Sequence, residues 1–202
     1  MRKIKRIISS ILTAAMLLPS VSSVVSAEMS ALKQSAASIS NDYLEFSVNK
    51  DTGFFAISTL DGHPQKAADN NMNLLYDGDS IETSFTTVRI DGKDYIFGQD
   101  YGIFGLSSSL EGPTVDAVNN TISMTWTING ISITQKAQIS RTDNTSSTGN
   151  VHLSYQIDNK SEEEHDIGIR VMLDNALGEI DAPVTLVQSE LAPISKEVEF
   201  FA

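Results

Sequence analysis

The chain has 202 residues, with 14 Lys and Arg against 26 Asp and Glu, a formal net charge of −12, and no Cys. This length allows one domain or one domain with a short appendage, and the absence of cysteine excludes disulfide scaffolds, Cys-ligated zinc or iron–sulfur sites and thiol nucleophiles. The negative charge argues against nucleic acid or an anionic membrane as a partner, because both require clustered Lys and Arg.

The first 27 residues have the three parts of a secretory signal peptide. Basic residues at positions 2, 3, 5 and 6 precede an apolar stretch from Ile7 to about Val25, and the small side chains of Val25-Ser26-Ala27 favour cleavage before Glu28. A transmembrane anchor is the alternative, but Ser, Thr and Pro residues interrupt the apolar stretch, which disfavours a membrane helix. We therefore expect a secreted protein that is not an integral membrane protein after signal cleavage.

Residues 28–41 are rich in Ser and Ala and lack two-residue alternation, so they predict a flexible lead or a short helix. A β-sandwich domain is expected over residues 42–202. Its first strand is indicated by Leu44, Phe46 and Val48, which share one face of an alternating run.

Two dipeptides predict tight β-hairpins further along the chain. Asp91-Gly92 separates the alternating runs 85–90 and 93–97, and Asn129-Gly130 separates the runs 121–128 and 131–139. A type I′ turn needs a positive φ at both central residues, which Asp-Gly and Asn-Gly favour.

Further strands are predicted at residues 54–60, 151–157, 166–173 and 182–188, and helix is allowed only in the lead or near residues 174–178. About eight short strands with Gly-containing turns and no long helical pattern predict an all-β fold, an antiparallel β-sandwich. The chain ends on Phe200-Phe201-Ala202 without a polar tail, so the terminus is either docked on the domain or continued beyond Ala202.

No histidine lies in a recognisable catalytic motif. His63 is in a polar loop, His152 is on the strand face opposite the aliphatic residues, and His165 follows three glutamates. None is accompanied by a G-x-S-x-G or H-E-x-x-H pattern, so we interpret all three as solvated surface residues and assign no catalytic residue. Carboxylates are too abundant for any pair of them to indicate a glycosidase site.

Two acidic loops contain oxygen ligands of the kind that Ca²⁺ prefers: Asp69, Asn70, Asn71 and Asn73 in one, and Asp174, Asn175, Glu179 and Asp181 in the other. Neither loop has the EF-hand spacing. We favour hydrated loops and expect no metal or other cofactor, with Ca²⁺ as the open alternative.

Five residues are candidates for binding a ligand: Arg89, Tyr101, Phe104, Arg170 and Asp174. The two aromatic residues lie in the Gly-rich loop 98–112, and aromatic faces can stack on sugar rings. The two arginines lie mid-strand opposite the aliphatic stripe, where each is either a fork for a ligand or a salt-bridge partner of Asp174 or another neighbour; we favour the salt bridge. Trp126 alternates with Met124 and Ile128 and is predicted to pack in the core.

Two stretches of the chain carry a resemblance to a known group. They are Leu74-Leu75-Tyr76 with residues 83–98 (TSFTTVRIDGKDYIFG), and residues 165–174 (HDIGIRVMLD) with Leu177, Gly178 and Asp181. Over roughly Asp42 to Glu190 the chain resembles secreted bacterial proteins with a galactose-mutarotase-like β-sandwich domain. The resemblance implies an antiparallel sandwich of the carbohydrate-handling type and a chain that continues beyond Ala202. Mutarotases use a His and a Glu that match no position here, so no catalytic residue is carried over.

These observations lead to two hypotheses. The first is a secreted, non-catalytic β-sandwich module that binds glycan or cell-wall material, or that forms a structural part of a surface protein. The second is a carbohydrate-active enzyme, an epimerase, lyase or hydrolase, that uses a histidine with a carboxylate. The second hypothesis requires a histidine in a concave pocket within hydrogen-bond reach of an acid.

Overall fold

The computed structural model describes residues 36–61, 67–76, 81–141 and 149–177, and the pairs 180–181, 186–187 and 190–191. The described residues form antiparallel β-sheets and two 3₁₀ helices of three residues each, η1 (Ala67–Asp69) and η2 (Gly102–Phe104). They contain no candidate for a membrane-spanning helix. The prediction of an all-β fold with antiparallel sheets is confirmed. The predicted signal peptide, His63 and residues 192–202 lie outside the described residues.

The first sheet contains β1 (Ala36–Ser40), β2 (Leu44–Asn49) and β3 (Phe55–Thr59), paired in this order. The prediction of a flexible lead or helix is wrong for residues 36–40, because they pair with β2 along their whole length. Ile39 lies opposite Phe46, and both side chains are buried. The Ser and Ala residues around Ile39 carry almost no alternation of their own, so the strand depends on the neighbour that it pairs with.

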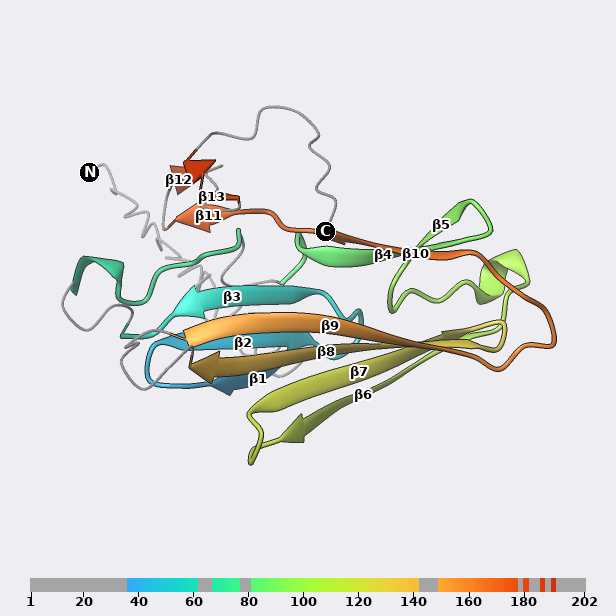
Figure 1. Ribbon diagram of the computed structural model, residues 1–202, viewed down its shortest axis with the longest axis horizontal. Helices are drawn as coiled ribbons and strands as arrows, with labels where there is room; N and C mark the ends of the chain where they lie inside the picture. Colours follow the sequence, from blue (N-terminus) through green and yellow to red (C-terminus); the bar gives the residue numbers. More distant parts are fainter. Residues whose placement is uncertain are drawn as a thin grey trace, which may run out of the picture.

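The largest sheet contains β6 (Ser108–Asp116), β7 (Thr121–Ile128), β8 (Ile131–Arg141) and β9 (Gly149–Asn159), in the order β6-β7-β8-β9 (Figure 1). Asn129 has a φ of 46° and Gly130 a φ of 84°, so the predicted hairpin between β7 and β8 is confirmed. The predicted loop 98–112 is wrong from Ser108 onwards. Leu110 pairs with Trp126 there and packs against the core, which recruits the second half of the stretch into the sheet.

A third sheet contains β4 (Phe85–Ile90), β5 (Lys93–Ile96) and β10 (Ile167–Met172), in the order β10-β4-β5. Asp91 and Gly92 have φ values of 50° and 79°, so the second predicted hairpin is confirmed too. Four two-residue strands follow: β11 (Ala176–Leu177), β12 (Ile180–Asp181), β13 (Leu186–Val187) and β14 (Glu190–Leu191). The helix allowed near residues 174–178 is not formed over residues 174–177, where β11 pairs with β12.

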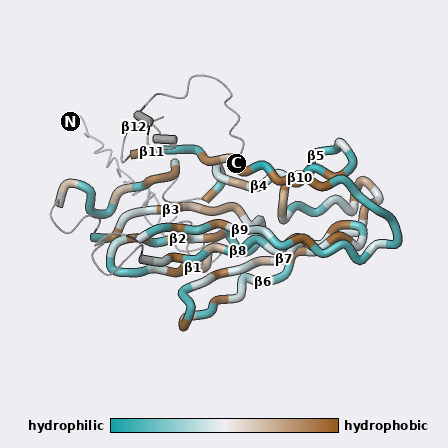
Figure 2. Tube along the Cα trace, viewed as in Figure 1, coloured by the Kyte–Doolittle hydropathy of each residue, from teal (hydrophilic) through white to brown (hydrophobic). Residues whose placement is uncertain are grey.

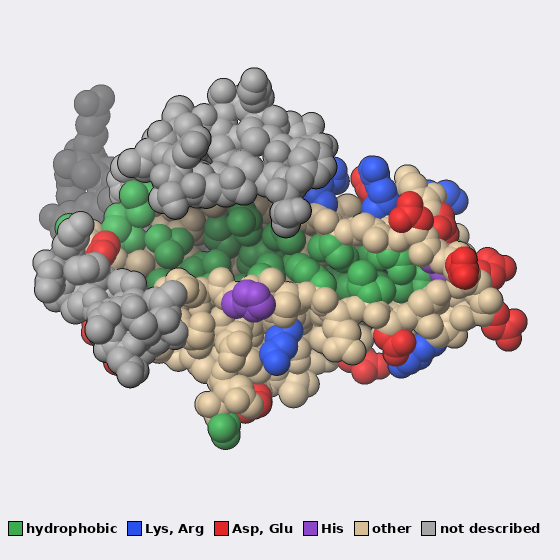
Figure 3. Space-filling model, in the orientation of Figure 1, with side chains coloured by type: hydrophobic (Ala, Val, Ile, Leu, Met, Phe, Trp, Pro, Cys, Tyr) green, Lys and Arg blue, Asp and Glu red, His purple; other side chains and the backbone are tan. Residues whose placement is uncertain are grey.

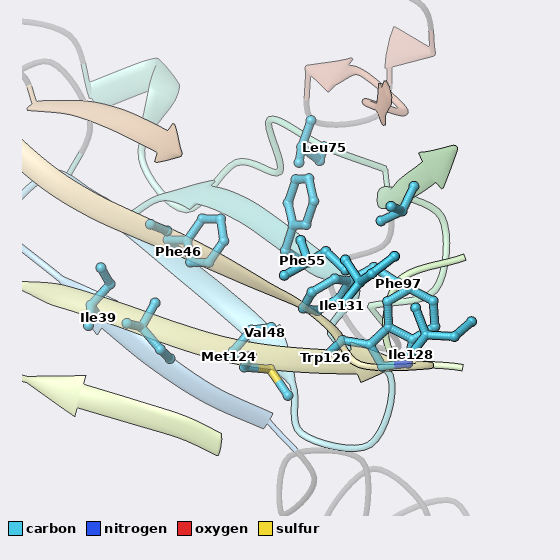
Figure 4. Packing of buried hydrophobic residues seen from close by; sticks show 14 of the residues in the cluster. Ile39, Phe46, Val48, Phe55, Leu75, Phe97, Met124, Trp126, Ile128 and Ile131 are labelled. Atoms are coloured by element: carbon cyan, nitrogen blue, oxygen red, sulfur yellow. The ribbon is translucent and has the colours of Figure 1, made fainter. Parts of the chain in front are cut away.

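The hydrophobic core is one cluster with side chains from all three of these sheets (Figure 4). Trp126 is fully buried in this cluster, as predicted, and its indole N–H donates a hydrogen bond of 3.1 Å to the carbonyl of Gln99. Phe46 stacks on Phe55, with ring centroids 5.6 Å apart. Apolar and polar residues alternate along the strands (Figure 2), so each sheet presents one apolar face to the common core.

The core is least covered along β9 and β10. In the described residues these are edge strands of their sheets, and their inward side chains are only partly buried. Figure 3 shows a band of hydrophobic side chains reaching the surface on this face. Strands β7 and β8, each flanked by a neighbour on both sides, bury their inward side chains almost completely.

Candidate functional site

The sheet β10-β4-β5 brings two of the predicted ligand residues together on its outer face. Gly168 of β10, Arg89 of β4 and Asp94 of β5 form one row of register partners. Arg170 is two residues from Gly168, so its side chain is on the same face, in the neighbouring row beside Thr87. We call these five residues the arginine face.

Ion pairs organise the arginine face around one carboxylate. Arg89 donates two hydrogen bonds to Asp94, from Nε to Oδ1 at 2.7 Å and from Nη2 to Oδ2 at 3.1 Å. Arg170 Nη2 lies 3.5 Å from Asp94 Oδ2. The hydrogen bonds and the charge of Arg89, with a smaller contribution from Arg170, hold the pKa of Asp94 below its usual value, and Asp94 in turn raises the pKa of Arg89.

The charged side chains of the arginine face are open to solvent, whereas Thr87 is buried. Its residues, with Ile169, line a shallow depression of about 300 Å³. The side chain of Arg89 is 59% exposed and that of Arg170 is 70% exposed, whereas Asp94 is 38% exposed. Two guanidinium groups and one carboxylate therefore border a concave surface that a polar ligand can reach.

The prediction of a salt bridge with Asp174 or another neighbour is confirmed, and for both arginines the partner is a neighbour other than Asp174. Asp174 lies beyond the end of β10, where its N–H donates to Ser84 Oγ and its carbonyl accepts from the Tyr76 N–H. Asp94, which the sequence analysis did not name, is this neighbour. A two-residue turn at Asp91-Gly92 requires position 89 to pair with position 94. The predicted hairpin therefore already indicated that Asp94 lies beside Arg89.

The two aromatic candidates have different surroundings, and neither lines the depression. Tyr101 is held in the structure: its hydroxyl accepts a hydrogen bond of 2.8 Å from the Ile96 N–H, and its ring meets Tyr95 edge-on at 5.2 Å. Phe104 is 71% exposed at the end of η2, beside the equally apolar and 87% exposed Ile103. Phe104 is therefore the candidate whose ring face is available to a ligand.

A second cluster, which the sequence reasoning missed, surrounds His165. Its Nδ1 lies 2.7 Å from Asp91 Oδ2, and its Nε2 lies 3.1 Å from Ser161 Oγ. The imidazole is only 17% exposed and borders a pocket of about 140 Å³ with Lys93 and Tyr95 among its other lining residues. The interpretation of His165 as a solvated residue is therefore wrong, whereas His152 is exposed as predicted.

Hydrogen bonds fix both neighbours of His165. Asp91 Oδ1 accepts the Asp166 N–H at 3.0 Å, and the hydrogen bonds from His165 and Asp166 lower the pKa of Asp91. Ser161 Oγ is also within 2.7 Å of Asn159 Oδ1 and 3.0 Å of the Glu163 carbonyl. Because these two acceptors compete for its single proton, Ser161 anchors the turn between β9 and β10, and Asp91 and His165 are the pair available for proton transfer.

Metal binding has little geometric support in the described part of the chain, where no three His, Asp or Glu side chains are arranged to hold a metal ion. Of the two loops considered for Ca²⁺, the one at residues 69–73 is described, and the other is described only in part.

Comparisons of the chain with models of protein families, with curated proteins and with solved structures give no match. The resemblance to galactose-mutarotase-like domains therefore stays a prediction.

Proposed function

We propose that this protein is a secreted, non-catalytic module with a galactose-mutarotase-like β-sandwich, and that it binds glycan or cell-wall material through the arginine face. The observation that carries the proposal is the shallow depression bordered by Arg89, Arg170 and Asp94. Sugar hydroxyls can accept hydrogen bonds from the two guanidinium groups and donate to the carboxylate. An open depression also suits a segment of a long polymer better than a small enclosed metabolite.

The exposed ring of Phe104 supports the proposal as a separate contact. It lies outside the depression, at the loop that follows β5, so it would meet a neighbouring part of an extended chain. A structural role in a surface protein, without a ligand, is the version that remains if no glycan binds.

The direct test is a glycan array combined with a cell-wall pull-down. We expect the wild-type protein to bind glycans on the array or to be retained by cell-wall material, and Arg170→Ala to lose this binding. The substitution removes a highly exposed guanidinium group and leaves the Arg89–Asp94 pair in place. Lys136→Ala is the matched control, because it removes a positive charge from β8, in the sheet β6-β7-β8-β9. This variant should bind like wild type. If Arg170→Ala lowers the melting temperature and changes nothing else, Arg170 has a structural role only.

The His165 pocket favours a second candidate function, a carbohydrate-active enzyme with a His and carboxylate pair. Asp91 orients the imidazole through Nδ1, and Nε2 would exchange a proton with a substrate that displaces its 3.1 Å contact with Ser161 Oγ. Reducing-end release and sugar anomerisation, measured over a panel of polysaccharides and aldoses, test this function. Activity in wild type that Asp91→Asn and His165→Gln abolish without unfolding the protein would support it, and an inactive wild type would reject it.

A further inference from the structure

We infer that the glycan recognised by the arginine face carries an anionic group, a carboxylate or a phosphate; the inference rests on the function proposed above. Charge balance is the first argument. Among the residues that line the depression, two guanidinium groups face one carboxylate, so the face has one positive charge in excess. This excess is opposite in sign to the formal net charge of −12 of the whole chain.

The hydrogen bonds show which arginine is available. Arg89 directs Nε and Nη2 at Asp94, so its fork is already occupied by a carboxylate. Arg170 approaches the same carboxylate only to 3.5 Å and is 70% exposed, which leaves most of its five N–H donors to solvent. A planar guanidinium binds a carboxylate or a phosphate through two parallel hydrogen bonds, and such charge-assisted pairs are stronger than hydrogen bonds to neutral hydroxyls.

Gly168 provides the room for this anion. It is the register partner of Arg89 on β10, two residues before Arg170, and it presents no side chain to the depression. A Cβ at this position would contact only the Cβ of Arg89, at 3.8 Å. Position 168 therefore adds no side chain to the lining of the depression, which leaves an oxyanion room to approach Arg170.

Binding to four polymers distinguishes recognition of the anionic group from recognition of the sugar that carries it. They are polygalacturonate, its methyl-esterified neutral form, a glycerol-phosphate polymer and a neutral glucan. Binding of wild type, Arg170→Gln, Asp94→Asn and Lys136→Gln to each is measured by affinity electrophoresis and calorimetry. Thermal melts verify that each variant is folded.

We expect wild type to bind at least one anionic polymer, with an affinity that falls as salt is added. Arg170→Gln should weaken this binding about tenfold or more, since it removes a charge-assisted pair. Asp94→Asn should strengthen it, because the fork of Arg89 is then released for the ligand. Lys136→Gln should bind like wild type, and the two anionic polymers together tell carboxylate from phosphate.

Two results would overturn the inference while the proposed function stands: binding of a neutral polymer in preference to both anionic ones, or anion binding that neither Arg170→Gln nor Asp94→Asn changes. Binding of no polymer of any kind would instead remove the proposed function itself.

Discussion

At the scale of single residues, a buried polar network connects the sheets through the core. Thr86 donates a hydrogen bond of 2.7 Å to Gln135 Oε1 and lies 2.6 Å from the hydroxyl of Tyr155. Gln135 Nε2 donates in turn to the carbonyl of Gly53 at 3.0 Å. Strands β4, β8 and β9 and the turn before β3 thus share one network, which is stabilising because each of these groups has a partner. Burial raises the pKa of Tyr155 to about 12.

Replacing Tyr155 by Phe tests this network. The folded-state pKa of Tyr155 lies above the ordinary value of 10.0, so its contribution to stability is present below pH 10 and is lost as the pH rises through the folded pKa. We expect wild type to lose stability above pH 10 more steeply than Tyr155→Phe, in denaturant titrations at stepwise higher pH. Ultraviolet titration should also show one late-ionising tyrosine that the variant lacks. Parallel pH profiles for the two proteins would contradict this assignment.

At the scale of elements, glycines at positive φ set the turns that lead into and out of β5. Gly92 has a φ of 79° in the β4–β5 hairpin, and a Cβ there would meet nothing within 4 Å. Gly98 follows β5 with a φ of 83°, and a Cβ there would collide with the carbonyl oxygen of Thr52. The first position requires glycine for its backbone conformation alone, and the second also requires it for a close approach to the β2–β3 turn.

These two glycines make a matched pair for mutagenesis. Gly92→Ala should lower the free energy of unfolding by about 1–2 kcal/mol, because a residue with a side chain is strained in the left-handed region. Gly98→Ala should cost that amount and about 1–3 kcal/mol more, because the methyl group collides with backbone rather than with a movable side chain. Urea unfolding of both variants measures the difference. Equal losses of unfolding free energy in the two variants would show that the turn before β3 moves away freely from the new methyl group at position 98.

At the scale of the whole molecule, the acidic surface residues make the protein less stable as the pH falls. Hydrogen bonds lower the pKa of four exposed aspartates: from His165 to Asp91, from Arg89 to Asp94, from the Gly102 N–H to Asp100, and from Asn119 to Asp116. A carboxylate with a depressed folded-state pKa contributes stability that is present above its unfolded value, about 4, and is lost as the pH falls through the folded value.

We therefore expect the melting temperature to decrease as the pH falls below about 4. A variant with Asp91→Asn and Asp116→Asn should be less stable at neutral pH and should show a flatter profile in acid. Glu162→Gln, which removes a charge from an exposed turn, should keep the wild-type profile. Melting followed by circular dichroism between pH 2 and pH 6 provides the comparison, and identical slopes for wild type and the double variant would contradict the role given to these hydrogen bonds.

The predictions that succeeded concern neighbours in sequence. The alternation around Trp126 correctly placed it in the core, and Asn129-Gly130 correctly placed a hairpin. The strand at Ile39 was missed because its own residues alternate weakly and its pairing with β2 supplies the stabilisation. The hydrogen bond from the Ile96 N–H to the Tyr101 hydroxyl was not predicted, since a Gly-rich stretch does not reveal such a contact.

The candidate sites show the same difference between contacts of neighbours in sequence, which were predictable, and contacts between distant strands, which were not. Arg89 and Asp94 are paired by a two-residue turn and were within reach of sequence reasoning, although Asp94 was not named. Arg170 approaches them only because β10 pairs with β4 in one particular register, and His165 meets Asp91 for the same reason.

Local patterns in the chain were enough to predict the strands, the two hairpins and the negative charge. Two-residue alternation, the tolerance of Asn, Asp and Gly for positive φ, and ionisation are properties of residues and of their nearest neighbours. The pairing of β10 with β4, and the outer face with two guanidinium groups around a single carboxylate, follow instead from the three-dimensional fold. Pairing between strands far apart in the chain depends on the summed packing of the shared core, which no local pattern records.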